Sequence, residues 1–149
     1  MNITRNDIEN IRDAARDDYG TLDGWCHKNA LFLAEKLYER GISPYLVWGY
    51  SVVGKPQYKK MDDVEKSGFT HFWVEATVNG KKRVIDLYSI DTTTDGEIIF
   101  DVDRPRDYHT PTDDPAYIPY YNSLRETDLL SYEEYTTLKS AGKLVETVN

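Results

Sequence analysis

The feature that constrains the fold most strongly is a hairpin signal in the middle of the chain, THFWVEATVNGKKRVIDLYS (residues 70–89). Two runs rich in β-branched and aromatic residues flank Asn79-Gly80, and this dipeptide strongly favours a two-residue turn because both turn positions need positive φ. With these two residues as the loop, Trp73 faces Asp86 across the paired strands. The sequence therefore predicts an antiparallel hairpin with a defined register.

One face of this hairpin is apolar, and the other carries polar side chains that can meet. The apolar face consists of Phe72, Val74, Ala76, Val78, Ile85 and Leu87. It fixes the register, because a slip by one residue would bury the opposite set. On the other face His71 and Asp86 are diagonal neighbours, about 7–8 Å apart at the backbone and within side-chain reach. The register therefore predicts a hydrogen bond between this imidazole and this carboxylate.

Helices and further strands surround the hairpin. The patterns that precede it predict a helix over residues 5–18 that begins near NDIE (Asn6–Glu9), a second helix with Asp23 as its N-cap and a stop at Gly41, a strand over 43–53 and a polar connection over 54–68. The patterns that follow it predict a strand over 96–102, an irregular Pro-rich segment over 103–121 and a last helix over 131–142. Helices that precede an antiparallel meander define an α+β fold, with the N-terminal helices packed on the sheet.

Length, charge and cysteine content limit the class of protein. A chain of 149 residues can bury a normal core, so we expect one domain over residues 1–149 with its core at about 20–102. The net charge of −8 repels nucleic acid and anionic membranes, and we expect neither as a partner. A single cysteine excludes an internal disulfide, and no apolar run indicates a signal peptide or a membrane span. These features favour a cytoplasmic protein.

The only cysteine, Cys26, lies where the second helix is expected to begin. The first helical turn carries partial positive charge and free N–H groups, which favour a thiolate. A free cysteine is equally often a small buried hydrophobe. A thiol, an imidazole that takes its proton and a carboxylate that orients the imidazole are the parts of an acyl-transfer site. The hairpin supplies the last two, His71 and Asp86, but spacing alone does not bring Cys26 beside them.

That step is supplied by a resemblance. GWCHKNALFLAEKLYERGISPYLVWGY, followed by HFWVEA and VIDLY, resembles the transglutaminase-like superfamily over Gly24–Tyr88. The resemblance implies a papain-like fold in which Cys26 is the nucleophile, His71 the general base and acid, and Asp86 the orienting acid. The sequence has no clear equivalent of the side chain that completes the family's oxyanion hole, so the backbone N–H of Cys26 is the one donor we name. The chain after residue 89 does not match the family.

The resemblance implies a cysteine-dependent enzyme that acts on amide bonds of a peptide or protein substrate through a thioester, without a cofactor. A hydrolase, such as a protease, isopeptidase or deamidase, is our first interpretation. A crosslinking transglutaminase and a noncatalytic peptide- or protein-binding module on the same fold are the alternatives. No residue decides between water and an amine as the acyl acceptor.

The aromatic residues allow two interpretations. Trp25, Trp48 and Trp73 are either core residues or the walls of a substrate-binding cleft. The tyrosines after residue 105 either build a peptide-binding surface or pack a loop-rich lobe: Tyr108, Tyr117, Tyr120, Tyr121, Tyr132 and Tyr135.

The remaining polar candidates are weaker. His27 adjoins Cys26, and because successive helix residues do not face each other it is expected at the rim or in solvent. Glu75 is an alternative partner for His71, although a strand-edge charge is the simpler interpretation. A zinc site from Cys26, His71, His109 and an acid fits no common zinc spacing, so no metal is expected.

Overall fold

The structure, a computed structural model, describes residues 2–20, 22, 26–113 and 117–120. Along the chain its elements are α1 (Arg5–Tyr19), α2 (Cys26–Glu39), β1 (Tyr45–Ser51), α3 (Met61–Ser67), β2 (Thr70–Val78), β3 (Lys81–Asp86), β4 (Ile99–Asp101), β5 (Tyr108–His109) and β6 (Tyr117–Pro119). The described part of the chain is thus an α+β fold with three helices and a six-stranded antiparallel sheet. In this part no helix combines the length and the apolar character that crossing a membrane requires.

The sheet is a meander with two short additions. Its order is β4-β3-β2-β1-β5, and β6 also pairs with β1. The predicted hairpin register is confirmed, since Val78 pairs with Lys81 and the ladder runs on from there. Asn79 and Gly80 have φ of 54° and 80°, the positive values that a two-residue turn of this kind needs.

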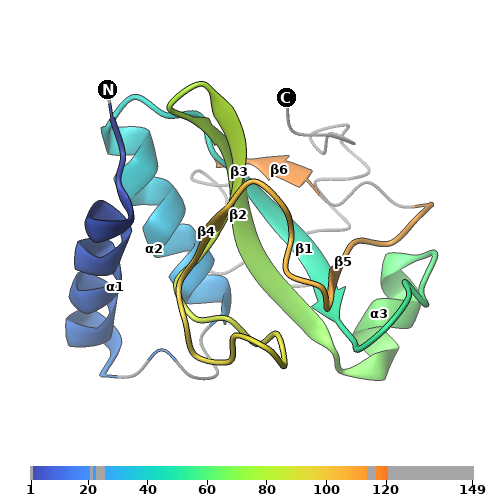
Figure 1. Cartoon of the computed structure of the whole chain (residues 1–149). Helices are drawn as coiled ribbons and strands as arrows, with labels where there is room; N and C mark the ends of the chain where they lie inside the picture. The colour runs from blue at the N-terminus through green and yellow to red at the C-terminus, as the bar shows by residue number, and fades with distance from the viewer. Residues whose placement is uncertain (1, 21, 23–25, 114–116, 121–149) are drawn as a thin grey trace.

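The two faces of the sheet are covered differently. Figure 1 shows α1 and α2 side by side on one side of the sheet, and α2 packs on β2. The main core lies there, and it contains the whole predicted apolar face of the hairpin. A smaller cluster lies on the opposite face: Val47, Trp73, Val84, Ile99, Tyr108 and Tyr117. Two of its members come from the segment after residue 102, so this segment covers the face that carries His71 and Asp86.

Three details differ from the sequence-based expectation. α1 is capped by Thr4, whose side chain accepts from the backbone of Asp7 while Asp7 accepts from Thr4, so the capping box begins before NDIE. The connection over 54–68 contains α3, because Met61 and Val64 are three residues apart and both buried. The segment over 103–121 contains β5 and β6, which pair with the free side of β1. The last helix, over 131–142, lies outside the described residues.

Candidate active site

Three elements end or begin at one place and bring the predicted residues together. Cys26 is the first residue of α2, His71 is the second residue of β2, and Asp86 is the last residue of β3. The register would set Tyr88 opposite His71, but β3 ends before it. At the level of His71 the β3 ladder has therefore stopped, which leaves the start of β2 accessible to the beginning of α2.

The predicted hydrogen bond between His71 and Asp86 is confirmed. Nε2 of the imidazole lies 2.7 Å from Oδ2 of the carboxylate, and the two side chains are only 2% and 4% exposed. The other carboxylate oxygen accepts the backbone N–H of Tyr88 at 3.2 Å. Because Nε2 is occupied by Asp86, Nδ1 is the ring nitrogen that remains for a nucleophile.

His27 and His71 are the two groups that act on the Cys26 thiol through hydrogen bonding and charge. Burial alone would raise the pKa of the thiol, but the two hydrogen bonds and the positive charge of the imidazoles outweigh burial and lower the pKa to about 6. The resemblance implies that Cys26 is a nucleophile beside the His–Asp pair, and this role stays a prediction. The residue is half-buried rather than sealed in the core.

His71 is shifted in the opposite direction. Burial alone would lower the pKa of the imidazole, but the charge of Asp86 and the hydrogen bond to it, aided by Cys26, raise the pKa to about 9. Between these two pKa values the stable form of the pair is a thiolate beside an imidazolium. This form combines an ionised nucleophile with a ready proton donor.

His27 is half-buried, so of the two expected positions, rim or solvent, the structure favours the rim. Its ring lies 4.3 Å from the ring of Phe72, and it is one of the groups that lower the pKa of the Cys26 thiol. Side chains of a first helical turn point back toward the helix start, and here the helix start faces β2. The rule that successive helix residues diverge does not prevent a contact between such short-range neighbours.

Tyr108 is a further residue at this place, and the sequence did not single it out from the other tyrosines. Its hydroxyl donates to Oδ2 of Asp86 at 2.6 Å, and its ring lies edge-on to His71 at 5.1 Å. Burial and the charge of Asp86 raise the pKa of Tyr108, so the hydroxyl stays protonated and acts as a donor. A strand of two residues leaves no periodicity that a sequence pattern could reveal.

The two described tryptophans belong to the core. Trp48 is 2% exposed and stacks on Phe72, and Trp73 is completely buried. Neither offers a surface to a substrate in this structure, which corrects the cleft-wall interpretation in favour of packing. Trp25 and the predicted N-cap Asp23 lie outside the described residues.

Glu75 and His109 have partners of their own. Glu75 accepts from the indole of Trp73 at 2.7 Å and from Arg104 at 2.8 Å, so it is not the partner of His71. His109 bonds the carbonyl oxygen of Val52. Within the described ranges no three His, Cys, Asp or Glu side chains are grouped as the ligands of a metal ion.

Fold and site together define an α+β protein with a buried imidazole–carboxylate hydrogen bond in its sheet and a single cysteine, Cys26, at the start of a helix. Comparisons of the chain with protein-family models, with curated proteins and with solved structures find no match.

Proposed function

We propose that this protein is a cysteine-dependent acyl-transfer enzyme with a transglutaminase-like, papain-like core, and that it hydrolyses amide bonds in peptides or proteins through a thioester. The observation that carries the proposal is the buried hydrogen bond between His71 and Asp86, together with the lowered pKa of the Cys26 thiol and the raised pKa of the His71 imidazole that acts on it. A structural cysteine in a core needs no such partners.

The arrangement supports a two-step reaction. The Cys26 thiolate attacks the amide carbonyl carbon, and the negative charge moves to the carbonyl oxygen, near the backbone N–H of Cys26 at the helix start. When the C–N bond breaks, the His71 imidazolium gives its proton to the leaving amine. In the second step His71 takes a proton from water, the hydroxide oxygen attacks the thioester, and the acid and the thiolate are released while His71 keeps the proton.

Asp86 has an indirect role in both steps. It accepts the Nε2 proton of His71, which fixes the tautomer that directs Nδ1 toward Cys26. Its charge also supports the imidazolium that the first step consumes and the second step restores. An amine in place of water in the second step would give crosslinking instead of hydrolysis, with the same three residues.

The first test measures the reactivity of Cys26 with iodoacetamide from about pH 5 to pH 9. Because the chain has a single cysteine, all labelling reports on this thiol. We expect the rate to rise through a pKa of about 6, and to be lost in Cys26→Ala. A rate that rises only near the ordinary thiol pKa of about 8.5 would remove the basis of the proposal.

The second test measures product formation and thioester trapping on a peptide library for three variants. Cys26→Ala and His71→Ala should abolish turnover, because nucleophile or proton carrier is missing. Asp86→Asn should lower kcat by about 10⁴-fold with little change in KM, as expected when the imidazole is held in the wrong tautomer. If Cys26→Ala leaves peptide binding intact and no variant changes any product, the noncatalytic binding module is the better assignment.

A further inference from the structure

The residue outside the proposed triad whose side chain bonds its carboxylate, Tyr108, belongs to a separately anchored segment. The Tyr108 hydroxyl and the His71 Nε2 atom bond the same oxygen of Asp86, at 2.6 Å and 2.7 Å. Tyr108 is 3% exposed, so no water competes freely for this oxygen. The hydroxyl in turn accepts the backbone N–H of Ile90 at 3.1 Å, which fixes the direction of its proton toward Asp86.

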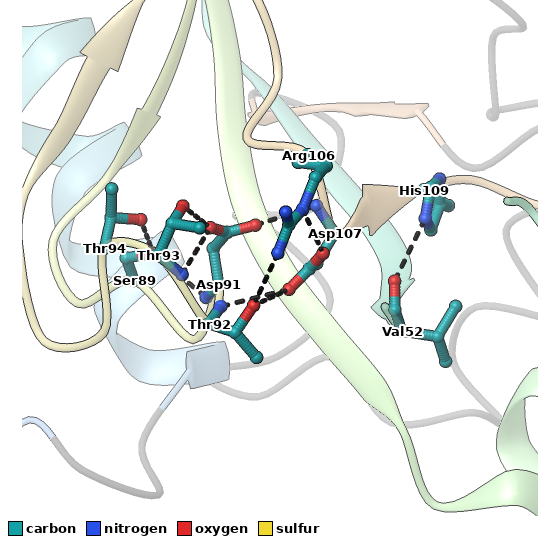
Figure 2. A network of polar contacts seen from close by, with 9 residues as sticks. All are labelled: Val52, Ser89, Asp91, Thr92, Thr93, Thr94, Arg106, Asp107 and His109. Carbon is teal, nitrogen blue, oxygen red and sulfur yellow. Dashed lines mark hydrogen bonds and ion pairs between the residues drawn. The ribbon is translucent and has the colours of Figure 1, made fainter. Parts of the chain in front are cut away.

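On one side, the chain next to Tyr108 is fastened to the loop after β3 by two buried carboxylates (Figure 2). Asp91 accepts the backbone N–H of Asp107 at 2.7 Å. Asp107 accepts the backbone N–H and the hydroxyl of Thr92, at 3.0 Å and 2.7 Å. Each segment thus supplies a carboxylate that binds the backbone of the other, and both carboxylates are at most 1% exposed. Buried carboxylates with several donors hold a loop firmly.

On the other side, the same chain is fastened to the end of β1. The N–H of Val52 donates to the carbonyl of Asp107 at 3.0 Å, and the ring of His109 donates to the carbonyl of Val52 at 3.2 Å (Figure 2). The residues before and after Tyr108 are therefore both anchored. Side chains alternate along a strand, so these anchors leave the Tyr108 ring directed at Asp86 and His71.

The geometry points to Tyr108 as a positioning residue of the proposed active site: its hydroxyl holds Asp86 in the orientation that serves His71, and the contacts of Asp91 and Asp107 hold Tyr108. This inference rests on the proposed function, because a positioning role has meaning only if the His71–Asp86 pair serves Cys26. Tyr108 does not touch the thiol and would act only through Asp86.

The direction of the expected effect follows from the charges that meet here: Cys26 and His27 on α2, His71 on β2, Asp86 on β3 and Tyr108 on β5. At the pH where the thiol titrates, His71 is already protonated. Without the hydrogen bond from Tyr108, the negative charge of Asp86 is less well compensated. This charge cannot increase the protonation of His71 further, but it disfavours the nearby negative charge of the Cys26 thiolate more strongly. Loss of the hydroxyl also frees Asp86 to leave His71. Both effects raise the pKa of Cys26.

The test is the pH profile of iodoacetamide labelling for wild type, Tyr108→Phe and the matched control Tyr117→Phe. Tyr117 lies in the same covering segment and the same small cluster, and its hydroxyl bonds Arg104 rather than Asp86. We expect Tyr108→Phe to shift the profile to higher pH by about half to one unit, which is about two- to fivefold slower labelling at pH 6. Tyr117→Phe should follow wild type.

A double variant separates positioning from a general loss of stability. If Tyr108 acts through Asp86, Tyr108→Phe should have no further effect on the profile in an Asp86→Asn background. Equal shifts with and without the Asp86 carboxylate would overturn the inference, as would a Tyr108→Phe profile identical to wild type. A wild-type profile without reactivity at acidic pH would instead refute the proposed function itself.

Discussion

At the scale of single residues, Cys26 is notable because two imidazoles, those of His71 and His27, lower the pKa of its thiol. His71 is buried and hydrogen-bonded to Asp86, whereas His27 is half-buried and its ring packs against the ring of Phe72. Both hydrogen bonds and both charges lower the pKa of the thiol. Of the two, only His71 bonds a carboxylate, so His71 is the imidazole suited to carry a proton in the proposed reaction, and His27 contributes to the electrostatic field around the sulfur.

We therefore predict a graded response to the removal of each imidazole. His27→Phe keeps the aromatic contact with Phe72 and removes the polar interaction with the thiol, so the pKa of Cys26 should rise by about one unit, with labelling near pH 6 about fivefold slower. His71→Phe should remove labelling at acidic pH altogether. The pH profiles of iodoacetamide labelling measure both effects. A His27→Phe profile that matches wild type would show that His27 does not bond the thiol in solution.

The residues of the site differ in how far the sequence could predict them. The His71–Asp86 bond follows from one turn, because Asn79-Gly80 fixes which residues of two adjacent strands are neighbours. The approach of Cys26 depends on how a helix packs across the sheet, and only the resemblance suggested it. Tyr108 reaches Asp86 from 22 residues away in a Pro-rich stretch. No local rule fixes that path.

At the scale of elements, β1 requires a glycine, Gly49, where it runs beside His71 of β2. Gly49 pairs with His71 of β2. A Cβ atom at Gly49 would lie within 3.0 Å of both the His109 carbonyl oxygen and the Trp73 ring. The missing side chain lets Trp73 lie against β1, where it is also a ring neighbour of His71 and Tyr108. The reason for a glycine here is therefore close approach.

Gly49→Ala should consequently destabilise the protein and loosen the site. Neither a backbone carbonyl nor a buried indole can move without disturbing β5, so we expect a loss of about 3 kcal/mol, the upper end of what overpacking costs. Urea unfolding measures the loss. Ser51→Ala, in the same strand, adds no atom and should cost less than about 1 kcal/mol. Equal stability of the two variants would contradict the close packing of Trp73 on Gly49.

Elements with strong periodicity or clear end signals were predictable, and among the short ones only β4 was. α1, α2, β1, β2 and β3 all lie where the patterns place them, because each is long enough for its apolar face to repeat. α3 offers only Met61 and Val64 as a buried face. β5 and β6 exist because β1 has a free side, which is a property of the sheet and is invisible in their own residues.

At the scale of the whole molecule, the protonation of Cys26 and His71 is linked to the stability of the fold. The two faces of the sheet differ. The main core lies under the helices on one face, and the His71–Asp86 pair lies beneath the segment after residue 102 on the other. The thiol and the imidazole meet between these layers. At neutral pH the folded state keeps one proton on His71 and none on Cys26, whereas the unfolded state keeps one on the thiol and none on the imidazole.

Near neutral pH the Cys26–His71 pair thus binds the same number of protons in the folded and the unfolded state. Cys26→Ala should make these two numbers differ. In the variant the folded state still holds a proton on His71, because Asp86 is the largest cause that raises its pKa. The raised pKa stabilises the fold fully below the unfolded pKa of 6.5, and this stabilisation is lost as pH rises toward the folded pKa. The unfolding free energy of Cys26→Ala should therefore fall between pH 7 and pH 8.5 by about 1–2 kcal/mol more than that of wild type.

Urea unfolding at the two pH values measures this difference, and the comparison cancels every other titrating group that wild type and variant share. Cys26→Ala combined with Asp86→Asn is the control: without the carboxylate the pKa of His71 loses its main support, so the extra pH dependence should disappear. If wild type and Cys26→Ala instead lose stability in parallel, the thiol does not hand its proton to His71 in the folded state. The thiolate–imidazolium pair, and with it the source of the acid-range reactivity, would then have to be abandoned.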